Sequence, residues 1–223
     1  MNLEVVKTAV VLHGITASGK SSFANSMIQY LTEKGLSTQS FSTDDFFITS
    51  EGRYRFDVTK LAEYHAKNLD LFMTALKEGT DVIICDNTNL VPWQSESYTN
   101  GAREYEYKIL FVDFKPRSIV EHFKAQEVTE EYPDAHGIPK EAIERMINDY
   151  DQYRDLLYKD TIIDIKKHVT YVWDNEKKQR VVAAEPSKYF ELDHLIVIEP
   201  EDLKESIDSL LEQISRYVMK GKI

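Results

Sequence analysis

The sequence predicts an α/β fold in which five parallel strands form a sheet with helices on both faces, with a small β-hairpin inserted late in the chain. Apolar runs that alternate with amphipathic runs are typical of β-α units. The first apolar run leads into a glycine-containing loop that opens a helix, and polar side chains follow two further apolar runs. Because ligands bind at the carboxyl ends of parallel strands, these polar groups should share one edge of the sheet.

The glycine-containing loop is the most informative stretch. The apolar run Val5–Leu12 precedes Gly14-Ile15-Thr16-Ala17-Ser18-Gly19-Lys20-Ser21-Ser22, which has the pattern G-x-x-x-x-G-K-S. Its glycines can adopt backbone angles that a Cβ forbids, so successive N–H groups can surround a β-phosphate. Lys20 can reach the β- and γ-phosphates, the Ser21 hydroxyl can ligate Mg²⁺, and the following helix directs its positive end at the same oxygens. The motif predicts a nucleotide-binding P-loop.

Composition narrows the class of protein. The formal net charge of −11 argues against a general binder of duplex nucleic acid, although one basic groove could hold an end or a short strand. The single cysteine, Cys85, excludes an intramolecular disulfide and a cysteine-based metal cluster, and it favours a reducing, cytoplasmic compartment. No apolar run approaches the ~20 residues of a membrane span. Met1–Glu4 has no basic region before a long apolar stretch, so no signal peptide is expected.

The next elements carry the first carboxylates of the candidate site. Apolar residues at helical spacing predict a helix over Ser21–Lys34, which Gly35 suits as an end. A short strand over Ser37–Thr43 then leads to Asp44 and Asp45. Asp44 is a candidate proton acceptor, with a helix cap or turn residue as its structural alternative. Asp45 is a candidate ligand of the Mg²⁺ sphere or an exposed turn carboxylate.

An aromatic loop, Phe46–Phe56, carries Arg53 and Arg55, and a long helix follows that Asp57 or Thr59 caps. Aromatic rings can stack on bases and arginines can hold phosphates. The loop is therefore a candidate acceptor-binding segment.

A second group of polar residues follows the clearest buried strand after the first, Asp81–Asp86. Its carboxyl end carries Asp86-Asn87-Thr88-Asn89. Asp86 is a candidate for the Mg²⁺ sphere or an acceptor contact, with a strand-end cap as its alternative. Beyond it we predict a helix over Pro92–Glu104, a strand over Tyr107–Phe114 and a helix from Pro116 to about Gln126.

The last third begins with a polar loop, Glu127–Gly137, and an amphipathic helix, Pro139–Leu157. Two β-rich runs around a polar turn then predict the hairpin, before a strand at Leu195–Ile198 and a helix at Pro200–Tyr217. We expect one domain over 1–223, made up of a core at about 5–158, the hairpin insertion at about 168–185, and a final strand and helix at about 192–218.

The P-loop alone does not choose between classes of nucleotide-binding protein. The chain has no guanine-reading Asn-Lys-x-Asp and no Ser-Gly-Gly-Gln type signature, which argues against a GTPase and a transporter ATPase. A small kinase remains, built from the P-loop, a carboxylate after the second strand and a kinase-type lid between two late helices.

At this point the ordered motifs resemble a known family, the polynucleotide-kinase-like P-loop kinases, which include phage polynucleotide 5′-kinases and kinase domains of larger eukaryotic proteins. The resemblance runs from about Val5 to Tyr153. It rests on Gly14–Ser21, Ser42-Thr43-Asp44-Asp45-Phe46-Phe47, Gly52-x-Tyr54-x-Phe56-Asp57, Asp86-Asn87-Thr88-Asn89 and His136-Gly137-Ile138-Pro139.

The resemblance implies an ATP- and Mg²⁺-dependent phosphotransferase that moves the γ-phosphate to the 5′-hydroxyl end of a polynucleotide. Lys20 and Ser21 match the nucleotide and Mg²⁺ contacts, and Asp44 matches the catalytic carboxylate that accepts the proton of the acceptor hydroxyl. Asp86 to Asn89 matches a segment that lines the acceptor site, so Asp86, Asn87 and Asn89 are expected to bind the acceptor.

The chain departs from the family pattern at two places. The family usually carries Arg-Asn shortly before the His-Gly-x-Pro of the lid, where this chain has Pro133-Asp134-Ala135, so the candidates for the lid arginine are Lys124, Arg117 and Arg145. Phe47 occupies the place of a phosphate-holding arginine of the viral kinases. A kinase for a small molecule or a modified nucleoside is therefore an alternative, and a catalytically inactive nucleotide-binding regulatory module is another. His65, on the apolar face of its helix, is expected to be a core histidine. We infer no membrane association and no stable protein partner.

Overall fold

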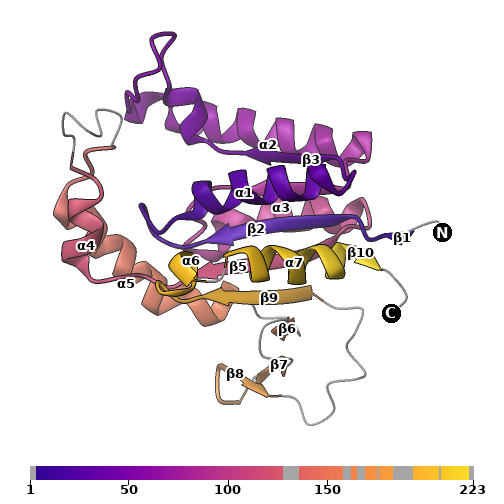
Figure 1. The fold of residues 1–223 in the computed structure, drawn as a ribbon. Coiled ribbons are helices and arrows are strands. Elements are labelled where there is room, and N and C mark those ends of the chain that lie inside the picture. The colour runs from indigo at the N-terminus through magenta and orange to yellow at the C-terminus, as the bar shows by residue number, and fades with distance from the viewer. Residues whose placement is uncertain are drawn as a thin grey trace.

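The computed structural model describes residues 4–127, 136–157, 162–164, 169–174, 176–182, 193–205 and 207–220. The predicted five parallel strands are present and lie side by side, from one edge of the eight-stranded main sheet inward (Figure 1). Their spatial order is β3 (Thr38–Phe41), β4 (Val82–Cys85), β2 (Thr8–His13), β5 (Lys108–Phe114) and β9 (Asp193–Ile198). The P-loop strand β2 thus lies in the middle, between β4 and β5.

Helices cover both faces of this sheet. Val10 and Leu12 of β2 pack in one apolar cluster with α1 (Lys20–Glu33) and α7 (Ile207–Val218). The intervening residues, Ala9 and Val11, pack on the opposite face against two other helices, α2 (Leu61–Glu78) and α3 (Pro92–Glu104). Strand side chains alternate between faces, so a strand buried on both faces reads as a continuous apolar run.

The predicted apolar stripe of the first helix is confirmed. Phe23, Met27 and Leu31 are all fully buried between α1 and the sheet. Burying each of these side chains contributes about 1.5–3 kcal/mol, which fixes α1 against the strand that leads into the P-loop. Two short 3₁₀ helices precede α2: η1 (Asp44–Phe47) directly follows β3, and η2 (Val58–Lys60) is capped by Asp57, whose carboxylate accepts from Thr59 N–H.

The helix predicted to begin at Pro116 begins later. Helix α4 covers Ile119–Lys124, and Ser118 is its cap. The Ser118 hydroxyl accepts from Glu121 N–H, and the Glu121 carboxylate accepts from Ser118 N–H. This reciprocal pair gives hydrogen-bond partners to backbone N–H groups at the start of the helix. Proline cannot form such a pair, because it has no side-chain acceptor and no backbone N–H.

Helices α6 (Asp202–Glu205) and α7 both lie within the predicted C-terminal helix, and residue 206 between them is outside the described residues. The predicted first strand is divided into β1 (Glu4–Val5) and β2, and β1 pairs with the unpredicted strand β10 (Met219–Lys220). Helix α5 covers Lys140–Leu157, as predicted to within one residue.

The predicted hairpin is present as β7 (Val169–Asp174) and β8 (Gln179–Val182), which pair antiparallel. A short unpredicted strand, β6 (Ile162–Asp164), pairs parallel with β9 and antiparallel with β7, so the hairpin extends the edge of the main sheet.

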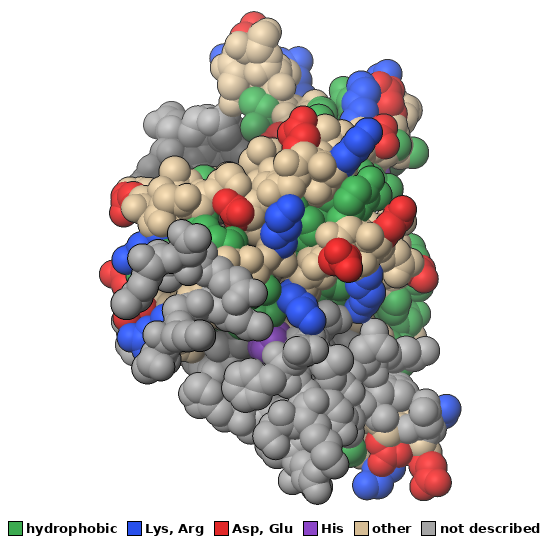
Figure 2. Space-filling model, turned by 90° about the vertical axis from the view of Figure 1, so that its right-hand side faces the viewer, with side chains coloured by type: hydrophobic (Ala, Val, Ile, Leu, Met, Phe, Trp, Pro, Cys, Tyr) green, Lys and Arg blue, Asp and Glu red, His purple; other side chains and the backbone are tan. Residues whose placement is uncertain are grey.

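Most of the predicted lid, residues 128–135, lies outside the described residues. Its two flanks are joined, because Gly137 N–H donates to the carbonyl oxygen of Gln126 (3.0 Å). None of the helices that the structure describes is long and apolar enough to cross a membrane. On the face at the amino ends of the strands, acidic and basic side chains are interspersed (Figure 2).

Candidate nucleotide and acceptor site

The P-loop connects β2 to α1 and has the backbone conformation that its glycines predict. Gly14 has a φ of +152°, and a Cβ there would lie 2.9 Å from both Cβ and the carbonyl oxygen of Phe114. Gly14 N–H donates to the carbonyl oxygen of Thr88 (3.0 Å), which ties the loop to the segment after β4. Gly19 (φ +95°) opens α1, and Ala17 adopts a φ of +53° that is uncommon without glycine. Strain of this kind concentrates at functional loops.

Lys20 is buried against the loop that it follows. Its Nζ donates to the carbonyl oxygen of Ile15 (2.8 Å) and to Ser18 Oγ (3.4 Å). Burial lowers the pKa of Lys20 to about 8, although the charges of Asp86 and Asp44 oppose this change. An anion bound in the loop would supply the further negative charge that a buried ammonium favours.

Asp86 provides an observation that fits Mg²⁺. The carboxylate lies just after β4, and its buried Oδ1 has no hydrogen-bond partner among the described residues. Burial raises the pKa of Asp86, whereas the charge of Lys20 and a hydrogen bond from Ser21 lower it. An unpaired carboxylate oxygen beside a serine hydroxyl offers the hard oxygen ligands that Mg²⁺ prefers.

The described side chains form only part of the coordination sphere of such an ion. In the described part of the chain, no group of three His, Cys, Asp or Glu side chains could bind a metal. Mg²⁺ usually keeps several waters and binds through one or two protein oxygens together with phosphate oxygens. Ser21 and Asp86 fit that arrangement, and Asp45 lies in the same electrostatic neighbourhood, because its charge acts on Asp86. Burial, followed by the charge of Asp44, raises the pKa of Asp45.

Asp44 is exposed at the start of η1 and does not cap it, because Thr43 is the cap residue and no side chain caps the helix. Its carboxylate is instead held by Tyr54, whose Oη donates to Asp44 Oδ1 (3.0 Å). Asn87, from the segment after β4, accepts at Oδ1 from Thr43 N–H (3.0 Å). The polar residues after β3 and β4 therefore position each other, as the shared sheet edge predicts.

Asn89 does not reach the surface. Its side chain is 1% exposed, and its Nδ2 donates to the carbonyl oxygen of Leu12 (2.8 Å) in β2. In this position the side chain supports the strand that leads into the P-loop, and its contact with an acceptor stays a prediction.

Arg53 and Arg55 lie exposed on the loop that follows η1, which projects from the body of the molecule (Figure 1). The Nε of Arg53 lies 4.0 Å from a carboxylate oxygen of Glu51. The loop has an internal aromatic core, since Phe47 is 3% exposed and its ring lies 5.1 Å from that of Phe56. Phe47, which stands in the place of the phosphate-holding arginine of the viral kinases, is therefore packed inside the loop. The side chain of Phe56 is 55% exposed.

The prediction of a core histidine at His65 is wrong. The side chain is exposed, and its Nδ1 lies 3.1 Å from Thr43 Oγ1, within hydrogen-bond distance and next to Asp44. Partial burial lowers the pKa of His65, and the charge of Asp44 opposes this change. By contrast, Cys85 is fully buried as predicted, and burial raises the pKa of its thiol to about 12.

A buried polar cluster beside the P-loop was not predicted. Asp113 Oδ1 accepts from His13 Nδ1 (2.9 Å) and from Tyr150 Oη (2.9 Å), while Oδ2 accepts from Arg154 Nε (2.6 Å). His13 directly precedes Gly14, whereas Tyr150 and Arg154 lie on α5. The sequence signal that could have indicated this cluster is Asp113 itself, a charged residue within the otherwise apolar end of strand β5. It joins the start of the P-loop to the helix that follows the predicted lid.

Asp113→Asn is expected to lower the free energy of unfolding at neutral pH by about 2–3 kcal/mol, because the Arg154 guanidinium loses its buried partner. Burial alone would raise the pKa of Asp113, but the hydrogen bond and charge of His13 and the Arg154 guanidinium hold it below its usual value. A lowered pKa contributes stability above the unfolded-state value of about 3.9, which is lost as pH falls through the folded-state pKa. In urea unfolding, the difference in free energy of unfolding between the variant and the wild type should therefore become smaller below about pH 4.

Asp155→Asn is the matched control, because Asp155 contacts the same arginine (3.8 Å) from a side chain that is 55% exposed. Its expected effect is below about 1 kcal/mol. Equal losses in the two variants, or a loss in Asp113→Asn that does not change with pH, would contradict the buried-charge argument.

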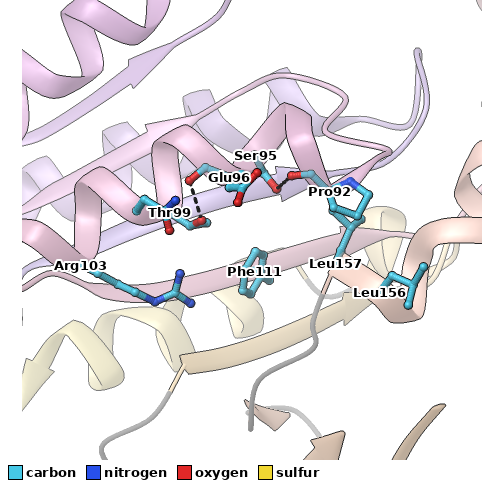
Figure 3. Close-up of a pocket in the computed structure, with 9 residues that line it drawn as sticks. Pro92, Ser95, Glu96, Thr99, Arg103, Phe111, Leu156 and Leu157 are labelled. Carbon is cyan, nitrogen blue, oxygen red and sulfur yellow. Dashed lines mark hydrogen bonds between the residues drawn. The ribbon is translucent and has the colours of Figure 1, made fainter. Parts of the chain in front are cut away.

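The structure also has a pocket away from this site. It has a volume of about 380 Å³ and lies between α3, β5 and the end of α5 (Figure 3). Arg103, Phe111 and Leu157 are among its lining residues. None of the predicted site residues lines it, so the phosphate and acceptor groups are gathered elsewhere.

Comparisons with known proteins agree with this arrangement. Residues 10–153 match the AAA_33 family, described as an AAA domain. Human NEDD4-binding protein 2 is 33% identical over 150 residues, which are 65% of this chain. The chain spans only 8% of the length of that relative.

Solved structures with little sequence identity share the fold. A putative kinase from Chloroflexus aurantiacus has a TM-score of 0.57 at 11% identity, covering 95% of this chain and 98% of that one. Chaetomium thermophilum Kti12, in complex with ADP-AlF3, has a TM-score of 0.53 at 13% identity, with 94% and 98% covered. A chain of the Pnkp1/Rnl/Hen1 RNA repair complex has a TM-score of 0.50 at 16% identity, with 96% and 86% covered.

The family match covers the P-loop, the acidic segments after β3 and β4, and most of α5. The matched range therefore includes all the candidate site residues. The chain belongs to the AAA_33 family, and it shares its α/β fold with these solved structures.

Proposed function

We propose that the protein is an ATP- and Mg²⁺-dependent phosphotransferase whose acceptor is the 5′-hydroxyl end of a polynucleotide. The observation that carries the transferase part is the convergence of Lys20, Asp44 and Asp86 from three strand ends. The charges of both carboxylates act on the pKa of Lys20, so the three groups share one electrostatic site. A phosphate-binding cation, a carboxylate with an unpaired oxygen and a second, exposed carboxylate are the groups that phosphoryl transfer requires.

Each group has a separate role in this proposal. The N–H groups of Gly14–Ser22 and the Lys20 ammonium bind the phosphates of ATP and stabilise the charge of the transition state. Ser21 and Asp86 would hold Mg²⁺, with Asp45 in its outer sphere, and the ion would neutralise charge on the phosphate oxygens. The acceptor oxygen forms a bond to the γ-phosphorus as the bond to the β–γ bridging oxygen breaks, and Asp44 takes the proton of the hydroxyl.

Several features support a polynucleotide acceptor. The motif set resembles the polynucleotide-kinase-like family, and a chain with the same fold belongs to a complex named for RNA repair. Arg53 and Arg55 are exposed on a loop that begins beside Asp44, where they can contact the phosphates of a strand. Phe56 leaves an exposed ring on the same loop, which a base could stack on.

A small molecule or a modified nucleoside is the second candidate acceptor. The buried position of Phe47 favours it, because this side chain cannot replace the phosphate-holding arginine of the viral kinases. The net charge of −11 also favours a small acceptor, since it opposes binding of a polyanion.

The test is transfer of ³²P from ATP to 5′-hydroxyl DNA and RNA oligonucleotides, compared with a panel of free nucleosides. We expect oligonucleotide labelling that weakens as salt increases. Arg53→Gln/Arg55→Gln should raise KM for the oligonucleotide and reduce the salt slope by about 0.7 per lost contact. KM for ATP should not change, and Arg216→Gln, on the exposed surface of α7, is the control. Labelling of nucleosides but of no oligonucleotide would reject the polynucleotide acceptor, and ATP binding without any transfer would favour a regulatory module.

A further inference from the structure

The proposed catalytic carboxylate is held from one side by a tyrosine that the sequence does not assign to the reaction. Tyr54 Oη donates to Asp44 Oδ1 (3.0 Å), across ten residues of chain. Burial of Tyr54, followed by the charge of Asp44, raises the pKa of the phenol, so the hydroxyl stays protonated and remains a donor. A protonated donor aimed at one carboxylate oxygen leaves Oδ2 for another partner.

Backbone hydrogen bonds close the loop that carries Tyr54. Arg55 N–H donates to the carbonyl oxygen of Phe47 (2.8 Å), and Thr49 N–H donates to that of Arg53 (2.9 Å). These two hydrogen bonds join opposite sides of the loop, one before and one after Tyr54. Tyr54 itself forms an antiparallel β-bridge with Ile48. The ring of Tyr54 lies 5.9 Å from that of the buried Phe47. The position of Tyr54 is therefore supported by contacts within its own loop.

A distant part of the chain completes the arrangement. His136 stacks on the Tyr54 ring, with 3.8 Å between ring centroids and 10° between planes. The N–H of the next residue, Gly137, donates to the carbonyl oxygen of Gln126. Gln126 directly follows the residue that caps the C-terminus of α4. Burial lowers the pKa of His136, which favours a neutral imidazole over a charged one on the tyrosine ring. Tyr54 is thus held between Phe47 on its own loop and His136 from 82 positions further along the sequence.

We propose that Tyr54 is a positioning residue for Asp44, and that His136 holds the Tyr54 ring in place for this task. The inference rests on the proposed phosphotransferase function. Tyr54 fixes Oδ1, so that Oδ2 faces the acceptor hydroxyl. As the acceptor oxygen bonds to the γ-phosphorus and ADP leaves, the acceptor O–H bond breaks and an Oδ2–H bond forms. Holding a proton acceptor in one orientation avoids its reorganisation during the reaction.

Tyr54→Phe removes the hydroxyl and keeps the ring that Phe47 and His136 contact. We expect kcat to fall about 10- to 100-fold, the effect of losing a hydrogen bond to a charged group, with KM for ATP unchanged. Tyr64→Phe is the matched control. Tyr64 belongs to the same aromatic cluster, 4.9 Å from Phe47, so its change removes a hydroxyl without touching Asp44.

A double-mutant cycle separates positioning from a general effect on the fold. If Tyr54 acts through Asp44, Tyr54→Phe should cost little further activity in an Asp44→Asn background. His136→Phe keeps a stacked ring and should retain most of kcat, whereas His136→Ala should resemble Tyr54→Phe. Thermal melts of all variants report on folding in the same samples.

The outcomes distinguish this inference from the function on which it rests. Wild-type transfer that depends on Lys20, with Tyr54→Phe as active as Tyr64→Phe, would overturn the positioning role alone. Additive effects of Tyr54→Phe and Asp44→Asn, or a loss in His136→Phe equal to that in His136→Ala, would overturn it as well. The absence of any transfer by the wild type would overturn the proposed function and this inference together.

Discussion

Lys20→Ala is expected to reduce phosphoryl transfer by at least about 10³-fold, the largest effect of any single substitution in this chain. The ammonium follows the loop that would enclose the phosphates, and it donates to the carbonyl oxygen of Ile15 and to Ser18 Oγ in that loop. In the transition state this buried group would face the charge that develops on the transferred phosphoryl group. Several kcal/mol of barrier reduction therefore depend on this one group.

Initial rates of ³²P transfer and the affinity for ATP measure this effect. Lys20→Met separates charge from volume, because it keeps most of the buried stem and should be as inactive as Lys20→Ala. Lys34→Ala is the control at the other end of α1, where the ammonium lies over the Tyr30 ring (5.2 Å) at the surface. Near-normal turnover by Lys20→Ala would end the interpretation of Gly14–Ser22 as a catalytic P-loop.

Asp44→Asn is expected to lower kcat by about 10²- to 10⁴-fold and to leave the affinity for ATP within a few-fold of wild type. An asparagine can still accept the hydrogen bond from Tyr54, so the local structure should persist. It cannot take the proton of the acceptor hydroxyl at its amide nitrogen. The substitution therefore removes the proposed base and little else.

Steady-state kinetics with varied concentrations of ATP and of acceptor measure the effects of the substitution on kcat and on each KM separately. Asp70→Asn, on the exposed surface of α2, is the control for the loss of one negative charge. A large loss of ATP affinity with an unchanged kcat would instead make Asp44 a binding or metal residue.

The sequence by itself determined the fold and the backbone conformation of the P-loop. The P-loop is a local structure, because each residue type in Gly14–Ser21 acts within one turn between a strand and a helix. The five parallel strands were equally predictable, since burial on both faces demands continuous apolar runs such as those of β2 and β4. The parallel arrangement then brings the segments after β3 and β4 to the P-loop, whatever their other residues are.

The boundaries that depend on local capping were less predictable than the elements themselves. Pro116 suits the first position of a helix, but α4 begins where Ser118 and Glu121 satisfy each other. Strand β10 and strand β6 are too short to have a pattern of their own, and they exist because β1, β7 and β9 supply their partners.

Only the tertiary structure decided which polar and aromatic side chains serve packing and which stay available to a ligand. Asn89 was expected near an acceptor and is buried, whereas His65 was expected in the core and is exposed. The contact of Tyr54 with His136, like that of His13 with Asp113, joins residues far apart in sequence. Residue type and spacing specify what a side chain can do, but its partners and burial are set by how distant elements pack, and no local pattern encodes that packing.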